Sequence, residues 1–95
     1  MPVFAVLYDY ADNSEEPRNV HRAAHREFLR TLTDPVKALA IGPFAAAPAG
    51  ALLVVEADSA PAVEKELDQD PFYLNGLVSR RQVREWTQVR GPWAG

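Results

Sequence analysis

Apolar residues along the chain gather in four short segments, as they do in proteins built around a β-sheet. Residues 3–10 carry apolar side chains on both faces of an extended chain, which predicts a strand buried on both sides. Residues 37–42 and 51–57 predict two short buried strands, and the Pro- and Gly-containing stretch between them predicts a hairpin loop. The last segment, about residues 78–89, mixes apolar and charged positions, which is typical of an edge or dimer-facing strand.

Helical patterns occupy two of the intervening stretches. The clearer helix is predicted from about residue 17 to residue 33, because Pro17 suits a first helical turn and Asp34-Pro35 closes the far end. A second, shorter helix is predicted to run to about residue 68. Asp58 or Ser59 can cap it by accepting the unpaired amide protons of its first turn.

The order of these elements predicts the fold class. Residues 70–76 predict a compact turn or short helix, which Gly76 can end by adopting a positive φ. The whole is a single α+β domain over residues 1–95, with the order of a ferredoxin-like βαββαβ sandwich and helices on one face of the sheet. A chain of this size buries only about 60–70% of its unfolded surface. Because the first strand needs a cover on its far side, we expect a homodimer with sheets packed face to face.

Composition narrows the possible partners and compartment. The chain has 95 residues, a net charge of −3 and no cysteine. The negative charge argues against a nucleic-acid partner, because phosphate binding relies on clustered Lys and Arg. The lack of cysteine excludes a disulfide framework, a thiol nucleophile and a zinc site of the cysteine type. The first residues have neither a basic stretch nor a long apolar run, so we expect no signal peptide, no membrane association and a cytoplasmic location.

A basic cluster lies in the last predicted strand, at Arg80, Arg81 and Arg84. Such a cluster is usually a solvated or ion-paired strand edge, and it is less often a site for an anionic ligand. We favour the strand-edge interpretation.

Two histidines lie on the apolar stripe of the first helix. Each residue advances about 100° around a helix, so with His21 at zero His25 lies near 40°, Phe28 near −20° and Leu32 near 20°. Buried histidine needs partners for both ring nitrogens, so both are candidates for chemistry. Alternatively, His25 is a core histidine bonded to a backbone carbonyl and His21 lies at the helix edge in water. Their spacing also suits a metal pair, but no glutamate lies between them and Arg22 disfavours a cation, so we expect no metal site.

Several short motifs follow one another along the chain. They are Arg18-x6-His25-x2-Phe28-Leu29-x2-Leu32, Ile41-Gly42-Pro43-Phe44, Val54-Val55-Glu56-Ala57-Asp58-Ser59, Asp70-Pro71-Phe72-x3-Gly76-Leu77 and Val83-Arg84-Glu85-Trp86. In order and spacing this series resembles the YciI-related (YCII) family, over nearly the whole chain. The resemblance implies a dimeric α+β barrel built from ferredoxin-like halves.

The resemblance also implies a pair of catalytic residues, a histidine on a helix and the aspartate of the Asp-Pro-Phe segment. By position these are His25 and Asp70. A carboxylate that accepts one imidazole N–H fixes the tautomer and makes the other nitrogen more basic, so that it can take a proton from a substrate. Asp70 is also suited to cap a short helix that starts at Pro71, and the two roles are compatible.

The remaining candidates would contact a substrate. Arg18 can hold an oxyanion, and His21 is a second polar candidate. The aromatic candidates are Tyr8, Phe44 and Phe72, which either line a pocket for a flat molecule or belong to the core.

No nucleotide motif, phosphate loop or redox thiol is present, so we expect no cofactor. The leading hypothesis is a cofactor-independent enzyme that acts on a small cyclic or aromatic molecule by isomerisation or by elimination of the dehydrochlorinase kind. The alternative is a non-catalytic ligand-binding or structural homodimer in which His25 completes a polar network.

Overall fold

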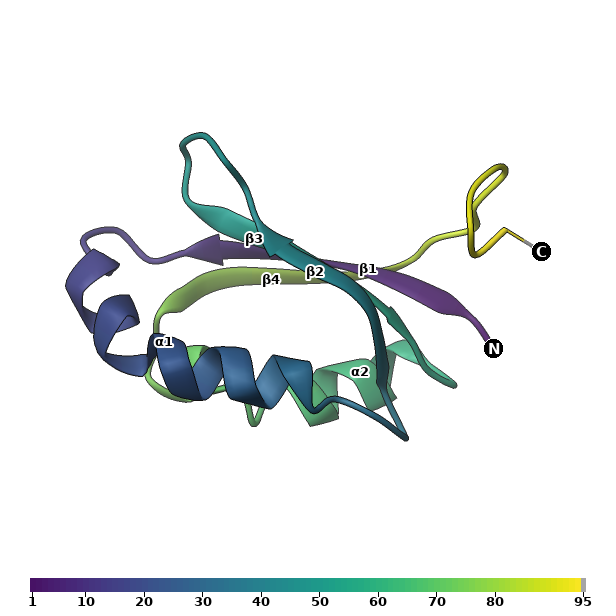
Figure 1. Cartoon of the computed structure of the whole chain (residues 1–95), viewed down its shortest axis with the longest axis horizontal. Helices are drawn as coiled ribbons and strands as arrows, with labels where there is room; N and C mark the ends of the chain where they lie inside the picture. The colour runs from purple at the N-terminus through teal and green to yellow at the C-terminus, as the bar shows by residue number, and fades with distance from the viewer. Residues whose placement is uncertain (95) are drawn as a thin grey trace.

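The protein forms two layers, a four-stranded sheet and a layer of helices against one of its faces (Figure 1). The structure is a computed structural model that describes residues 1–94. In chain order its elements are β1 (Val3–Tyr10), α1 (Glu15–Arg30), β2 (Lys37–Pro43), β3 (Gly50–Glu56), α2 (Ala60–Leu67), α3 (Pro71–Leu74) and β4 (Val78–Glu85). This arrangement confirms the ferredoxin-like α+β prediction, with the short helix α3 between α2 and β4.

The strands lie in the order β2-β3-β1-β4, and each neighbouring pair is antiparallel. The predicted hairpin is the β2–β3 pair. The first strand occupies a central position, where Phe4 pairs with Val55 of β3 and Glu85 of β4. The β1–β4 register shifts between Asp9 and Tyr10, an irregularity of the kind that locally increases twist and often occurs beside functional sites.

Helix α1 extends over Glu15–Arg30, whereas the sequence predicted about residues 17–33. The earlier start has an electrostatic reason, because Glu15 and Glu16 lie where the helix dipole favours negative charge. The earlier end coincides with Thr31, whose hydroxyl donates to the Glu27 carbonyl oxygen at 2.9 Å. The Thr31 N–H donates to the same carbonyl oxygen at 3.1 Å. The next N–H, of Leu32, donates to the Leu29 carbonyl oxygen at 3.3 Å, which is the tighter three-residue pattern found at many helix ends.

Strand β4 ends at Glu85, four residues before the predicted end near residue 89. Its partner β1 begins at Val3, and the Trp86 N–H donates to the Val3 carbonyl oxygen at 2.8 Å. Beyond this bond β1 offers no strand residue to pair with, so the ladder stops.

The remaining helices are short. Helix α2 begins after Ser59, whose hydroxyl oxygen accepts from the Ala62 N–H at 3.3 Å, so the predicted cap is confirmed. Helix α3 is followed by Gly76, which has the predicted positive φ of 69°. No helix in residues 1–94 is long and apolar enough to cross a membrane.

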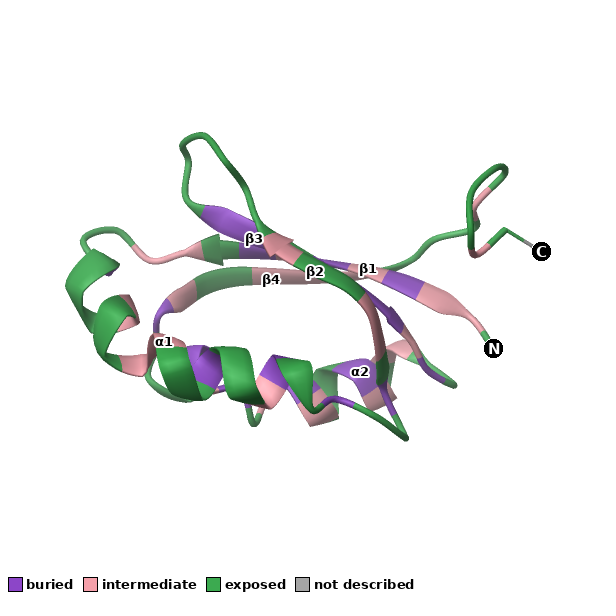
Figure 2. Cartoon of the chain, in the orientation of Figure 1, coloured by how far each residue is buried: buried purple, intermediate pink, exposed green. Residues whose placement is uncertain are grey.

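The core lies between the sheet and the helices, where most of the buried residues are found (Figure 2). Strand β1 presents Phe4, Val6 and Tyr8 to this core, and all three are buried. On its opposite face Ala5 and Leu7 are only half-buried. In the single chain β1 is therefore buried on one side, and burial of its other side remains a prediction that depends on a second subunit.

Candidate active site

A buried histidine and a buried aspartate meet between α1 and α3. His25 comes from the middle of α1, and Asp70 is the residue that caps α3. The His25 Nδ1 lies 2.7 Å from the Asp70 Oδ1, with 7% of His25 and 0% of Asp70 exposed. The contact thus joins two residues that are 45 positions apart in the chain.

Asp70 holds three hydrogen-bond donors at once. Its Oδ1 also accepts from the Phe72 N–H at 2.9 Å, which is the helix-capping bond, and its Oδ2 accepts from the Tyr8 hydroxyl at 3.0 Å. A buried carboxylate is costly unless such partners replace its water. The capping role and the contact with His25 therefore occur together in one side chain.

The surroundings of Asp70 also assign the proton on His25. Because Tyr8 and the backbone of Phe72 both donate to the carboxylate, we assign the ionised form to Asp70 and the donor role to the His25 Nδ1–H. The other ring nitrogen, Nε2, has no hydrogen bond to any residue in 1–94, and His25 lines a cavity. Nε2 is then the nitrogen that can exchange a proton with a bound molecule.

Tyr8 supports this network as a neutral phenol. Burial raises the pKa of Tyr8 far above its ordinary value, and the negative charge of Asp70 and the hydrogen bond to it raise that pKa further. Tyr8 therefore stays protonated at neutral pH and always donates to Asp70. Its ring packs in the core and does not line the cavity.

Aromatic rings continue from the histidine to the cavity edge. The Phe72 ring stacks on the His25 ring, with centroids 3.7 Å apart and an interplanar angle of 2°. Tyr10 meets Phe72 edge-on at 5.6 Å, and the Arg18 guanidinium lies 4.6 Å from the Tyr10 ring centroid. This stack fixes the orientation of the imidazole, and the Arg18 cation lies at the other end of the series of rings.

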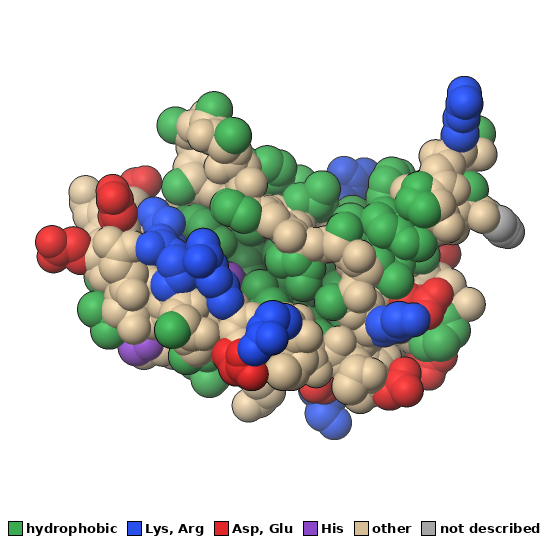
Figure 3. All heavy atoms as spheres, viewed as in Figure 1, with side chains coloured by type: hydrophobic (Ala, Val, Ile, Leu, Met, Phe, Trp, Pro, Cys, Tyr) green, Lys and Arg blue, Asp and Glu red, His purple; other side chains and the backbone are tan. Residues whose placement is uncertain are grey.

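The cavity has a volume of about 570 Å³ and lies between α1 and β2. A cavity of this size accommodates a small organic molecule. Its lining residues are Tyr10, Arg18, Arg22, His25, Arg26, Leu29, Arg30, Ala38, Leu39, Ala40, Ile41, Gly42, Pro43, Ala51 and Phe72. Figure 3 shows a hollow with hydrophobic side chains at its floor and Lys and Arg side chains gathered at one end.

The structure brings together most of the candidates from the sequence. His25, Arg18 and Phe72 line the cavity, and Asp70 and Tyr8 lie behind His25. His21 is half-buried on α1 and is not among the lining residues. Phe44 follows β2, is 46% exposed and also lies outside the lining.

Sequence reasoning did not select Tyr10, Arg22, Arg26 and Arg30, which all line the cavity. The signal for the arginines was present, since they follow Arg18 at intervals of four residues and so share one face of a helix. Tyr10 shares its strand face with Tyr8, and the alternation of side chains along β1 could have identified it.

The basic cluster of β4 lies apart from this cavity. Arg81 pairs with Asp68 at 2.9 Å and lies over the Tyr73 ring, while Arg80 and Arg84 are exposed. The structure thus shows an ion pair at Arg81. Within residues 1–94, no group of three or more His, Cys, Asp or Glu side chains is placed to hold a metal ion.

Two comparisons with known proteins gave matches. The family model described as YCII-related domain matches residues 2–87. No curated protein matches the chain. Among solved structures, 5-chloro-2-hydroxyhydroquinone dehydrochlorinase (TftG) from Burkholderia phenoliruptrix AC1100, in complex with 2,5-dihydroxybenzoquinone, is similar with a TM-score of 0.80 and 26% sequence identity. The match covers 98% of this chain and 99% of that one.

Proposed function

Because the chain belongs to the YCII-related family, we propose that it is a cofactor-independent enzyme that transfers protons on a small cyclic or aromatic molecule. The observation that carries the proposal is the 2.7 Å contact between the His25 Nδ1 and Asp70, with His25 at the wall of a 570 Å³ cavity. Phe72 and Tyr10 line the cavity beside His25 with aromatic surface, which suits a ring. The similar dehydrochlorinase, whose solved complex contains 2,5-dihydroxybenzoquinone, supports the same class of ligand.

His25 acts as the general base in this proposal. Its Nε2 accepts a proton from a substrate C–H or O–H, and the electron pair left behind forms a new double bond in the substrate. In an elimination, a leaving group on the neighbouring carbon departs with its bonding electrons. In an isomerisation, the imidazolium returns the proton to a different atom. Asp70 stabilises the positive charge on the imidazolium during either reaction.

Arg18 supplies charge stabilisation. It lines the cavity, and its Nε donates to the Ser14 hydroxyl oxygen at 2.9 Å while its guanidinium lies over Tyr10. These contacts hold the cation in one orientation before a substrate arrives. An enolate or phenolate oxygen that develops next to His25 would then meet a preorganised positive charge.

A proton-exchange experiment tests the proposal without knowledge of the natural substrate. In D2O, a base that removes and returns ring protons replaces C–H by C–D in 2,5-dihydroxybenzoquinone, and proton NMR follows the loss of signal. We expect the protein to accelerate this exchange. His25→Asn should abolish the acceleration, and Asp70→Asn should reduce it by about 100-fold.

The matched control is Asp58→Asn, which changes an exposed carboxylate outside the cavity and should leave the exchange rate unchanged. Circular dichroism establishes that each variant is folded. Binding of the quinone without any acceleration by the wild-type protein would contradict the enzyme proposal and would support a non-catalytic ligand-binding role.

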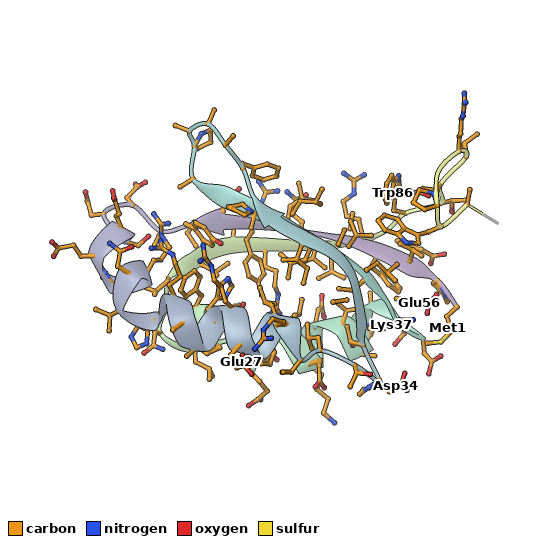
Figure 4. The ribbon with its side chains drawn as sticks, in the orientation of Figure 1. Met1, Glu27, Asp34, Lys37, Glu56 and Trp86 are labelled. Carbon is orange, nitrogen blue, oxygen red and sulfur yellow. The ribbon has the colours of Figure 1, made fainter. Side chains whose placement is uncertain are left out.

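The same proposal includes a homodimer. The sheet face opposite the helices carries Ala5, Leu7, Leu52 and Trp86, and Leu52 and Trp86 are 36% and 42% exposed. Figure 4 shows Trp86 on the side of the sheet away from the helices. A second copy related by a two-fold axis would cover this apolar face with its own.

A further inference from the structure

Four arginines form a row along one face of α1, on the wall of the cavity that contains His25. They are Arg18, Arg22, Arg26 and Arg30, and every one of them lines the cavity. Residues four apart on a helix are neighbours on its surface, so the row is continuous. We call these residues the arginine row.

Most of the row has no negatively charged partner. Of the four residues of the row, Arg30 alone forms an ion pair with another residue in 1–94, and its partner is Glu27. Arg18 and Arg22 donate to the neutral groups of Ser14 and Asn19. None of the residues that line the cavity is Asp or Glu, so the positive charge there is not balanced by the wall.

This arrangement has a cost for the helix. Like charges four residues apart destabilise a helix, and the arginine row contains three such pairs in succession. The arginine charges also act on Tyr10, another residue of the cavity lining. The Arg18 guanidinium lies 4.6 Å from the Tyr10 ring centroid. Burial raises the pKa of Tyr10, and Asp70 adds to that effect, whereas Arg18, Arg22 and Arg26 act to lower it.

The other walls of the cavity are mainly apolar. Ala38, Ile41 and Ala51 come from the sheet, and Phe72 adds an aromatic ring against which a planar ring can pack. Guanidinium groups without a carboxylate partner, at Arg18, Arg22 and Arg26, lie beside this apolar lining. Together they match a molecule with an apolar ring at one part and an anionic group at another.

We propose that the substrate is a planar ring acid, with its reacting edge at His25 and a carboxylate held by Arg22 and Arg26. The proposal rests on the proposed function and adds the substrate class to it. Arg18 is sufficient for the oxyanion that develops at the reacting edge, so Arg22 and Arg26 are free to hold a second anionic group. The planar fork of arginine fits a carboxylate through two parallel hydrogen bonds.

Calorimetric titration with two matched probes tests the proposal. Hydroquinone and 2,5-dihydroxybenzoate share the same ring and the same two hydroxyl groups, and only the second carries a carboxylate. We expect 2,5-dihydroxybenzoate to bind at least about tenfold more tightly at low salt, as charge-assisted hydrogen bonds require. The preference should decrease as the ionic strength rises to about 0.3 M, because salt screens charges at an open cavity.

A pair of double variants locates the effect. Arg22→Gln with Arg26→Gln should remove the preference for the carboxylate, which is the ratio of the two affinities measured on the same variant. Arg80→Gln with Arg90→Gln removes the same net charge from exposed positions outside the cavity. This control should retain the full preference, which separates local contacts from the total charge of the protein.

The outcomes also separate this inference from the proposed function. Equal affinity for the two probes, or a preference that survives in the Arg22/Arg26 double variant, overturns the ring-acid proposal. In His25→Asn the preference for the carboxylate should persist although proton exchange is lost. A failure of proton exchange in the wild-type protein, with the preference intact, would contradict the enzymatic role and leave the ligand class standing.

Discussion

Asp70 is the residue on which the site depends. Its buried carboxylate caps α3 through the Phe72 N–H, accepts from the Tyr8 hydroxyl and holds the His25 imidazole. Each partner compensates part of the cost of removing a charge from water. The carboxylate can therefore serve the fold and the chemistry together, and the capping role is no argument against the catalytic one.

Tyr8 should make the stability of the protein depend on pH, because its pKa is raised in the folded protein. The unfolded chain loses this phenolic proton near pH 10, whereas the folded protein keeps it. The stabilisation is therefore fully present below about pH 10 and is lost as pH rises above it. Tyr8 should contribute a decline of up to about 1.4 kcal/mol in the free energy of unfolding per pH unit.

Denaturant unfolding between pH 8 and about pH 12 checks this expectation. Tyr8→Phe should be less stable than wild type at pH 8, because Asp70 loses a donor, but its stability should decline less steeply above pH 10. Tyr73→Phe controls for the removal of an exposed phenol. An alkaline slope in Tyr8→Phe equal to that of wild type would refute the expectation.

Helix α1 connects core, site and cavity at the scale of the element. Leu29 packs into the core, His25 reaches Asp70, and the arginine row follows the cavity wall. The row places function and stability in conflict, since like charges at a spacing of four residues weaken a helix. Proteins commonly retain such a cost where a binding site requires it.

Arg22→Glu should reveal this conflict. The change replaces two repulsive pairs, with Arg18 and Arg26, by two attractive ones. The free energy of unfolding should therefore rise by up to about 1 kcal/mol at low salt. Binding of 2,5-dihydroxybenzoate should weaken at the same time. Thermal unfolding and calorimetry measure the two quantities, and a variant that loses stability while it keeps its affinity would contradict the role of the row.

At the scale of the whole molecule, the two faces of the sheet have different surroundings. One face packs against the helices and holds the core (Figures 1 and 2). The other face exposes Leu52 and Trp86. A small domain with an apolar sheet face gains stability when a partner covers that face. The proposed homodimer follows from this difference between the faces.

A charge placed on the uncovered face should separate the subunits. We expect wild-type protein to be a dimer at micromolar concentration in size-exclusion chromatography with light scattering, and Leu52→Arg to be a monomer, because a buried unpaired charge is costly. Leu74→Arg, at a 64% exposed position in α3, is the matched control and should remain dimeric. A monomeric wild-type protein would exclude the proposed face-to-face dimer.

Much of this fold was predictable from local patterns. Short runs of apolar residues identified the strands, and the caps at Ser59 and Gly76 lie where their residue types indicated. The predicted ends of α1 and β4 were less accurate, by two to four residues. The end of β4 depends on where β1 begins, since Val3 accepts the last ladder bond from Trp86, and a strand cannot specify its partner's length.

The sequence by itself determined the order of the elements and the side of α1 on which His25 lies, because both follow from short-range periodicity. The family resemblance implied the pair His25 and Asp70, but helical periodicity does not separate His25 from His21, since both share one stripe. Only the tertiary structure shows that His25 meets Asp70 while His21 does not. The two histidines are about 6 Å apart along the helix axis, so a partner fixed at one level contacts only one of them. The position of α3 sets that level, because Asp70 is its cap. The packing of α3 also brings Asp70 to Tyr8, 62 positions away in the chain, and His25 lines the cavity beside it.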